Sequence, residues 1–502
     1  MVNIMRITNK MMTNNMMSNI NKNKLYMSKL EQQYSSDKKI QRPSEDPIIA
    51  VRALKLRTNL SELKQYHEKN IPDAMSWMDV TEAALTTINT LLSNINTYCV
   101  QGSTDTLTAK DRSAIVQNLE HMKAQIYNEG NTNYAGRYVF TGYKTDNSLI
   151  FDKDRTDLSY TITEKQTSEQ IEFGRSVVGS YDLEDIDGDL NAAPRLVEYR
   201  RIQLSYDSLA GDASPNITYI KSIEDGDAPE DLPSHISIKT VSITDTDNSP
   251  YEPEADVIHY IPETGELILG TNAYEELKNA NQIDITYTKD SFKEGELKPE
   301  HYFDCELTDP DKPEKIIYTR PENKQEIQYE INYNQKLTVN TEAAEAITHK
   351  IGRDIDEILN AVNDVIATEE KIAQVKERLK DSNLPEADRK KYEKLLGQLD
   401  TELELKKEVM QEAFEKGNTT SSVGQDQVNA ALADLGSRYV RLQLTESRLA
   451  SQKVDLKELL SNNEDADMVE TIIKFGSAEV VYNASLNAAS RVVKNTLLDF
   501  LR

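Results

Sequence analysis

The sequence of 502 residues contains only two cysteines, Cys99 and Cys305. Because they lie in segments that read as different domains, they provide neither a disulfide framework nor a set of metal ligands. No stretch approaches the roughly 18 apolar residues needed to span a bilayer. The first residues also lack a compact apolar segment ending in small residues, so they do not resemble a secretory signal peptide. We therefore expect no membrane partner, and either a cytoplasmic protein or one exported without a cleaved leader.

Positive charge is scarce, because 58 Lys and Arg stand against 85 Asp and Glu, a net charge of -27. Nucleic-acid binding needs basic patches, so this balance argues against a nucleic-acid partner. The charge is unevenly placed, since residues 1–70 carry a net +7 and the remainder -34. A basic terminus on an acidic body favours head-to-tail association between copies, and ordinary solvated surface charge is an equally good interpretation.

Motifs for catalysis are missing as well. The sequence has no phosphate-binding glycine loop, and none of its six histidines belongs to an H-E-x-x-H motif. His301 and Cys305 have the residue types of a nucleophile pair, but positions in one strand give no pairing geometry. Residues 185–189 alternate carboxylates around a glycine as calcium loops do, yet Leu196 replaces the twelfth-position glutamate, which favours a plain acidic turn. We predict no catalytic residue, no metal site and no cofactor.

What the chain does have is a stripe of apolar residues at helical spacing near each end. Successive members of a stripe are three or four positions apart, which places each stripe on one face of a helix. The stripes predict terminal helices that need a partner surface, either each other or neighbouring molecules. The N-terminal stripe is Met5, Asn9, Met12, Met16, Ile20, Asn23, Met27, Leu30 and Tyr34, and the C-terminal stripe is Phe475, Ala478, Tyr482, Leu486, Ala489, Val493, Leu497 and Phe500.

Between these ends the period of the apolar residues changes twice. Helical signals include the Asp46-Pro47 start, a kink or division at Pro72, a capping box at Thr108 and Asp111, and a helical hairpin at about 368–417. The strands are expected at 158–163, 201–206, 217–220, 236–243, 257–261, 266–269, 282–287, 316–318 and 326–333, with a glycine turn at 263–265.

The predicted fold class is therefore α+β: an elongated helical bundle or coiled coil from both termini with an inserted β-rich outer region. The expected divisions are an N-terminal assembly helix (1–35), the first half of a helical rod (36–137), the β-rich outer part (138–340), the second half of the rod (341–462) and a C-terminal assembly helix (463–502).

Four segments resemble a known family. Residues 5–12 (MRITNKMM), 35–40 (SSDKKI), 42–47 (RPSEDP) and 136–146 (GRYVFTGYKTD) are similar to stretches of the flagellar hook–filament junction proteins, the hook-associated protein 3 family. This sequence has Asp37 where glycine is usual and Glu45 where aspartate is usual. The last 70 or so residues resemble the flagellin C-terminal region, whereas 150–325 resembles no family we can name. If the likeness holds, Met5 is the usual starting methionine.

The resemblance implies a structural axial protein of the bacterial flagellum, exported without a cleaved signal peptide. It implies copies of itself, an adjacent hook-associated protein, flagellin and a cytoplasmic export chaperone as partners. The self-assembly residues expected from the stripes are Met12, Met16, Ile20, Met27, Leu30, Phe475, Tyr482, Leu486, Ala489, Val493, Leu497 and Phe500. The chaperone is expected to bind Leu486, Val493, Leu497 and Phe500.

Other functions remain open at this stage. Filament flagellin is a near neighbour, although the GYKT segment at 142–145 and the break at 42–47 favour the junction protein. A surface adhesin with a ligand-binding β domain would be supported by an anchor or sorting tail, and a hydrolase by clustered acid–base residues. Neither feature is found in the sequence.

Overall fold

The computed structural model describes residues 9–499 except 105–106, 185–189, 212–213, 222–228, 245–248, 311, 313, 322 and 382–383, and it describes only the backbone of 9 and 492–499. Two compact units are present. The terminal unit comprises Met1–Asp73, Glu330–Lys336 and Arg441–Arg502, and the central unit comprises Ala74–Tyr329 and Leu337–Val440. The predicted α+β order, with long helices near both ends and strands between them, is confirmed.

The terminal unit is built from helices. Its elements are α1 (Asn9–Ser36), α2 (Pro47–Gln65), the π-helical turn η1 (Tyr66–Asn70), the end of α7 (Glu386–Glu464) and α8 (Met468–Asp499). The start of α2 is as predicted: the Asp46 side chain accepts hydrogen bonds from the backbone N–H of Ile48 and Ile49, and Pro47 occupies the first turn.

A division of the long helix near Pro72 is also confirmed. The π-helical turn η1 ends α2 and leads into α3 (Ile71–Gly102). The Ile71 N–H donates to the Tyr66 carbonyl, and Pro72, the second residue of α3, has no N–H to continue this pattern. The extra residue of a π turn changes the direction in which the following side chains point.

The helices of the central unit are α3, α4 (Ala109–Glu129), α6 (His349–Leu379) and the first part of α7. The capping box of α4 forms as expected between Thr108 and Asp111. Helix α6 begins later than the predicted 341, because a 3-10 turn, η5 (Ala343–Glu345), precedes it. The predicted hairpin is present, and α7 then continues without a break through Val423.

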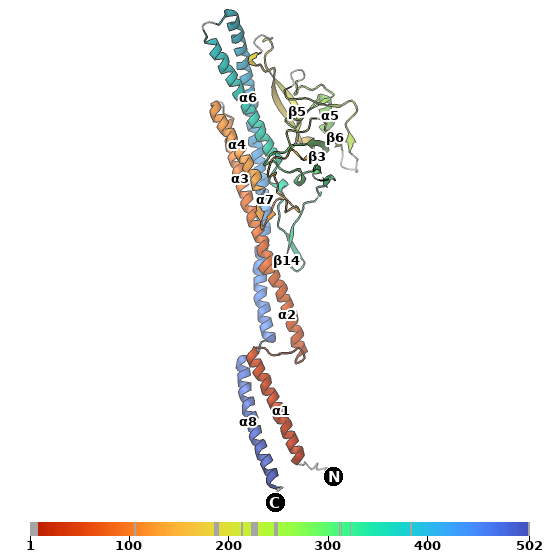
Figure 1. Ribbon diagram of the computed structural model, residues 1–502, viewed down its shortest axis with the longest axis vertical. Coiled ribbons are helices and arrows are strands. Elements are labelled where there is room, and N and C mark those ends of the chain that lie inside the picture. The colour runs from red at the N-terminus through yellow and green to blue at the C-terminus, as the bar shows by residue number, and fades with distance from the viewer. Residues whose placement is uncertain are drawn as a thin grey trace. The chain divides into compact units, whose positions relative to one another are not determined.

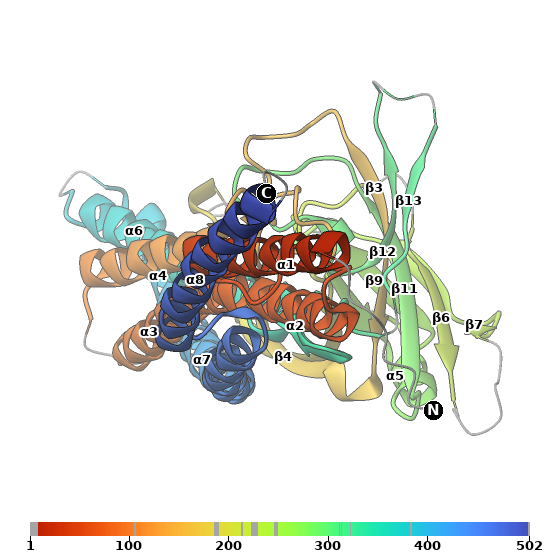
Figure 2. The same cartoon turned by 90° about the horizontal axis from the view of Figure 1, so that it is seen from below.

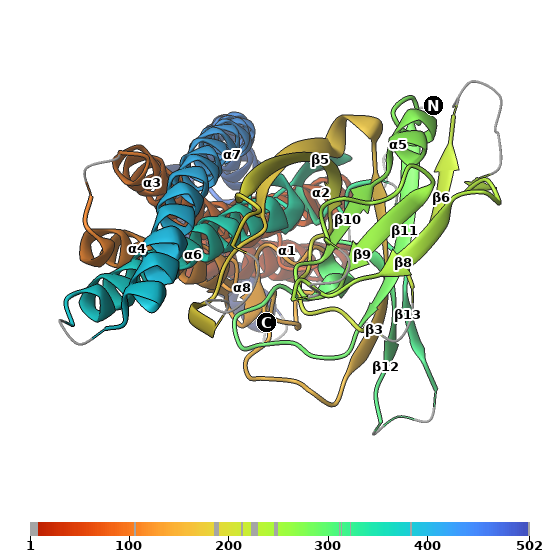
Figure 3. The same ribbon diagram turned by 90° about the horizontal axis from the view of Figure 1, so that it is seen from above.

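A larger antiparallel sheet and a mixed sheet make up most of the β-rich part (Figures 2 and 3). One has six strands in the order β13-β12-β3-β11-β6-β7, and the other five in the order β4-β5-β10-β9-β8, of which β8 and β9 run parallel. Buried residues of both sheets, including Ile162, Ile202, Tyr260, Leu267 and Ile285, form one core. Helices α6 and α7 lie along one side of this part.

The remaining bounds are as follows. The strands are β1 (Asn133–Tyr134), β2 (Arg137–Tyr138), β3 (Ser159–Gln166), β4 (Ile171–Val178), β5 (Arg195–Gln203), β6 (Asn216–Ile220), β7 (Glu230–Asp231), β8 (Ser237–Thr240), β9 (Val257–Ile261), β10 (Glu266–Leu269), β11 (Gln282–Lys289), β12 (Asp304–Thr308), β13 (Ile316–Tyr318), β14 (Gln328–Asn332) and β15 (Gln335–Thr338). The short helices are η2 (Ser168–Gln170), α5 (Thr271–Leu277) and η4 (Pro299–His301).

Several strand predictions hold and some fail. Strands β9, β10 and β13 have the predicted bounds, and Gly265 in the turn between β9 and β10 has φ +62°. Strands β4 and β15 and helix α5 were missed, and β5 begins at Arg195 rather than at Arg201. The placement of His301 in one strand with Cys305 is wrong, because Pro299 starts a 3-10 turn that contains His301. The acidic turn at 185–189 lies outside the described residues.

Candidate assembly surface on the terminal helices

Helices α1 and α8 pack side by side in the terminal unit (Figure 1). The α1 side chains turned toward α8 recur every three or four positions, and Ile20 and Leu30 are buried among them. Asn23 lies on the same line, and its Nδ2 donates a hydrogen bond of 3.2 Å to Oγ of Ser485 on α8. A polar pair inside an otherwise apolar line disfavours sliding of one helix along the other, which fixes the register.

The matching line on α8 alternates large and small side chains. It contains Met468, Thr471, Phe475, Ala478, Tyr482, Ser485 and Ala489, of which Thr471 and Ala478 are fully buried and the others half-buried. Large residues beside small ones let two helices approach closely while the rings of Phe475 and Tyr482 cover the gaps. The contact is nevertheless thin, because two helices alone cannot enclose a core.

Most residues of the predicted stripes lie on these two lines. Met16, Ile20, Met27, Leu30, Phe475, Tyr482 and Ala489 do so. Met12 and Leu486 lie beside the lines, with 46% and 42% of their surfaces exposed, since Thr13 and Ser485 take the inward positions. At Met12 and Leu486 the predicted stripes advance mostly by four residues, whereas the lines along which the two helices pair alternate steps of three and four residues. The side chains of Val493 and Leu497, and all of Phe500, lie outside the described residues.

Helix α8 carries a second apolar face that the sequence analysis missed. Val469, Ile473 and Val480 are 70%, 64% and 68% exposed, and they lie on the side of the helix opposite Ala478. Ile472 and Val481 flank this face and are half exposed. Steps of four, three and four from residue 469 through Gly476 to residue 480 give the same helical period as the inner line. We call Val469, Ile472, Ile473, Val480 and Val481 the outer face of α8.

The turn after α1 is tied to the turn before α8 by charges and backbone bonds. Arg57 on α2 holds the Glu464 carboxylate with two guanidinium nitrogens, at 3.1 and 2.7 Å from the same oxygen. Lys38 reaches Asp465 at 2.5 Å, and this hydrogen bond lowers the pKa of the Asp465 carboxyl. The backbone N–H of Ala466 donates to the carbonyl of Asp37 at 2.9 Å. The C-terminal end of α1 and the N-terminal end of α8 are therefore held together by these contacts.

Asp37 explains why glycine suits this turn in the similar family. Its φ is +58°, in the left-handed region that favours glycine, and aspartate is among the few other residues that tolerate it. The aspartate that stands here in place of the usual glycine is therefore compatible with the left-handed backbone of this turn.

The GYKT segment forms a compact connector in the central unit. Ala135 and Gly136 have φ of +50° and +80° and close the β1–β2 hairpin. The Tyr138 N–H donates to the carbonyl of Thr145 at 2.8 Å. The Lys144 Nζ donates to the carbonyl of Glu300 at 2.9 Å and lies 4.0 Å from the ring centre of Tyr318. The segment thus fastens the end of α4 to the strands.

The chemistry of the cysteines is that of core residues. Burial raises the pKa of both the Cys99 and the Cys305 thiol to about 12, so neither forms a thiolate near neutral pH. Over the part of the chain that the structure describes, no cluster of three or more His, Cys, Asp or Glu side chains has the arrangement of a metal site. None of the described helices combines the length and apolarity that crossing a membrane requires.

Comparisons with known proteins agree with this geometry. Residues 7–145 match the family model of the bacterial flagellin N-terminal helical region. The chain is 30% identical over 175 residues to flagellar hook-associated protein 3 of Salmonella typhimurium, a match that covers 35% of this chain and 54% of that protein. It is 32% identical over 128 residues to a flagellin of Clostridium tyrobutyricum, covering 26% of this chain and 34% of the flagellin.

By these matches the chain is similar to the class of flagellin-like proteins with a helical N-terminal region. Within it, the resemblance to the hook-associated protein 3 family is confirmed, and the match spans about half the length of the Salmonella protein. A crystal structure of Xanthomonas campestris FlgL covers 81% of this chain and 99% of its own, at 11% identity and a TM-score of 0.32.

Proposed function

We propose that this chain is a structural, non-catalytic subunit of the bacterial flagellum that forms the junction between hook and filament. It assembles with copies of itself through its terminal helices, between an adjacent hook-associated protein and flagellin. It leaves the cell without a cleaved signal peptide. The likeness to hook-associated protein 3 supports this role, as does the N-terminal match to the flagellin helical region.

The observation that carries the proposal is the second apolar face of α8. One face of the helix meets α1, and the opposite face, around Ile473 and Val480, meets water. Covering this face with another molecule gains roughly 25 cal/mol per Å² of apolar surface. A contact between different faces of identical subunits repeats from copy to copy, which is what a ring or tube requires.

The self-assembly surface divides between two kinds of residue in this proposal. Met16, Ile20, Met27, Leu30, Phe475, Tyr482 and Ala489 hold the α1–α8 pair together, and Met12 and Leu486, which are exposed, contact a neighbouring copy beside the outer face. The proposal assigns the same role to Val493, Leu497 and Phe500, which the sequence analysis predicted. Before export, the chaperone covers Leu486 and these three positions, which keeps an apolar helix from aggregating.

Filament flagellin is the second candidate, favoured by the match to the Clostridium flagellin. The two roles differ in copy number, since a junction is a short ring and a filament is a long tube. Electron microscopy of flagella from cells expressing a tagged chain distinguishes them: label confined to one band supports the junction, and label along the whole filament supports flagellin.

The assembly surface is tested by placing a charge on it. Val480→Asp puts a carboxylate in the middle of the outer face, and burying this group unpaired against a neighbour costs several kcal/mol. We expect cells that carry only this variant to export the protein but not to swim in soft agar. The matched control is Ile317→Asp on β13, because Ile317 is 69% exposed and Val480 is 68% exposed.

The control should swim normally, because Ile317 lies in the β-rich part. Both purified variants should keep the helical circular dichroism of the wild type, since each changed residue points to solvent in the free chain. Full motility with Val480→Asp, or equal loss in both variants, would contradict the assignment of the outer face.

A further inference from the structure

The five-stranded sheet has buried charge on the same face as an apolar cluster of Tyr199, Ile261 and Ile268. Glu172 on β4 and Arg201 on β5 are direct partners in the strand register, and Arg201 also contacts Glu266 on β10. The Arg201 side chain is only 4% exposed. A sheet face packed on helices is normally apolar, so a buried guanidinium at this position needs an explanation.

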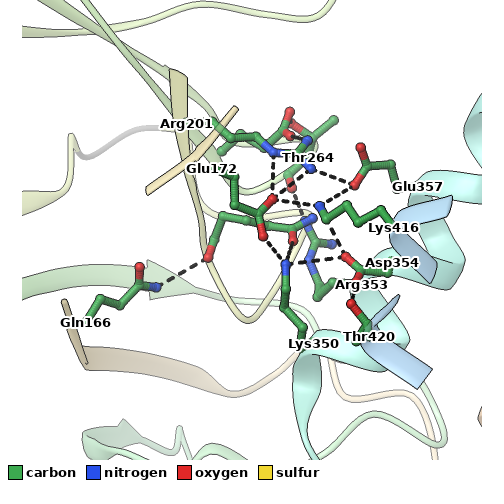
Figure 4. Close-up of polar contacts among 12 residues, drawn as sticks. Gln166, Glu172, Arg201, Thr264, Lys350, Arg353, Asp354, Glu357, Lys416 and Thr420 are labelled. Atoms are coloured by element: carbon green, nitrogen blue, oxygen red, sulfur yellow. Dashed lines mark hydrogen bonds and ion pairs between the residues drawn. The ribbon is translucent and has the colours of Figure 1, made fainter. Parts of the chain in front are cut away.

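Helices α6 and α7 supply the complementary charges (Figure 4). Lys350, Asp354 and Glu357 follow one another at steps of four and three, which places them on one face of α6. Glu357 reaches Nη2 of Arg201 at 2.6 Å. Lys416 on α7 lies 2.6 Å from Glu172, 2.9 Å from Glu357 and 3.2 Å from Asp354.

The contacts between these groups form a closed network across the two surfaces. Lys350 also contacts both Glu172 and Asp354, and the Thr420 hydroxyl donates to Asp354 at 2.5 Å. We call Glu172, Arg201, Glu266, Lys350, Asp354, Glu357 and Lys416 the charged cluster. Burial alone would raise the pKa of the Glu172 and Glu357 carboxyls, but the cationic groups around each lower the pKa to about 2. Both carboxyls are therefore ionised at any ordinary pH.

The contact between the β-rich part and the helices is not closely packed beside this cluster. A pocket of about 410 Å³ is lined by Lys350 and Thr420 and also by Tyr302, Phe303 and His349. The aromatic residues pack closely, since the His349 ring centre lies 4.5 Å from that of Tyr302 and 5.3 Å from that of Phe303. The β-rich part thus contacts the helices at this aromatic cluster, at the charged cluster and at an apolar contact where Tyr181 and Leu190 pack on α6 and α7.

Buried ionic networks contribute little net stability, because removing charges from water offsets most of their attraction. They demand one geometry, however, since a small rotation leaves several charges desolvated and unpaired. We propose that the charged cluster is an orientation clamp: the ionic contacts hold the β-rich part in a single orientation against α6 and α7. Acid opens the clamp by protonating its carboxylates.

The pH range for opening follows from the carboxyls. Their pKa is lower in the closed state than the ordinary value of 4.5, so their contribution is complete above about pH 4.5 and is lost as the pH falls toward 2. Charged neighbours outside the cluster are Arg353 on α6 and Lys289 on β11. Both pair with the Asp207 carboxylate, Arg353 at 3.3 Å and Lys289 at 3.6 Å. Arg353 and Lys289 also lower the pKa of the Asp207 carboxyl, and protonating this group weakens the contact further.

The clamp is tested by measuring the distance between the β-rich part and α7. Nitroxide labels at Lys239→Cys on β8 and Glu408→Cys on α7 report this distance, and both positions are exposed. The two native thiols are buried and do not compete for the label. The test variant is Glu357→Gln with Lys416→Met, which removes one charge of each sign from the helix side. The control is Glu377→Gln with Lys380→Met, an exposed pair at 2.7 Å with the same residue types.

We expect a single narrow distance distribution in the wild type and the control at pH 7. In the test variant the distribution should be roughly twofold broader, because the contacts that specify one geometry are gone. The melting temperature should stay within about 4 °C of the wild type, because the same network adds little stability. Lowering the pH of the wild type from 5 to 2 should reproduce the broadening, because the Glu172 and Glu357 carboxyls, whose pKa is about 2, become protonated only at that end of the range.

Two results would overturn the proposal. One is an unchanged distribution in the test variant, which would show that apolar contacts alone set the orientation. The other is loss of the helical circular dichroism in the test variant, because the cluster would then be needed for folding and not for orientation.

Discussion

Leu30 gives the sharpest test of the α1–α8 pair. It is 3% exposed on the line that faces α8, and Leu25, on the same helix, is 71% exposed. Leu30→Ala removes three buried carbon groups, which at about 0.8 kcal/mol each costs about 2.4 kcal/mol. Leu25→Ala removes the same atoms from a mostly wet position, at a cost of about 0.5 kcal/mol after the better helix propensity of alanine is counted.

The assay is amide hydrogen exchange of α1 in the purified chain. Because 1.4 kcal/mol is a factor of ten, Leu30→Ala should raise the exchange rates along the middle of α1 about 50-fold, and Leu25→Ala about two- to threefold. In the wild type these amides should already exchange faster than those of α6, because α1 packs on one helix and α6 lies within the central unit.

Two observations would refute this reasoning. Equal effects of the two substitutions would mean that α8 does not cover Leu30. Exchange of the wild-type α1 amides at the rate of an unfolded chain would mean that the helix forms only after assembly. Protection of α1 equal to that of α6 would instead contradict the idea that the terminal helices need neighbouring subunits for full stability.

The remaining predictions concern the central unit. Gly265→Ala should lower the free energy of unfolding by about 3 kcal/mol, because the residue has φ +62° and the added Cβ would collide with the carbonyl oxygen of Tyr206. Gly295→Ala should lower it by only about 1–2 kcal/mol, because Gly295 has φ +87° but open space around it. Urea titrations measure both changes. Burial, with the charge of Lys144, lowers the pKa of His301 to about 3, so its contribution to stability is complete above about pH 6.5 and is lost as the pH falls toward 3. The loss amounts to about 2 kcal/mol at pH 5. The free energy of unfolding of a His301→Gln variant should therefore depend less on pH in this range. A variant at the exposed His121 should keep the wild-type dependence.

The helix and turn signals were readable because they act over a few residues. The Asp46 cap, the Thr108–Asp111 box and the Gly265 turn each depend on backbone groups within four positions, so the residue types alone identify them. Strand β5 was partly missed for the opposite reason. Its charged residues read as solvent-facing, and only the register with β4 places Arg201 beside Glu172.

By itself, the sequence determined that both ends form helices with an apolar stripe and that strands lie between them, because a stripe depends only on the 3.6-residue period. Only the tertiary structure decided which apolar line of α8 meets α1 and which remains exposed. Ser485 rather than Leu486 faces α1, since the hydrogen bond to Asn23 and the close approach of small side chains favour that register. It also decided that seven charged residues from five elements form one cluster beside the sheet. No local sequence pattern predicts this cluster, because its energy comes from contacts between residues distant in sequence.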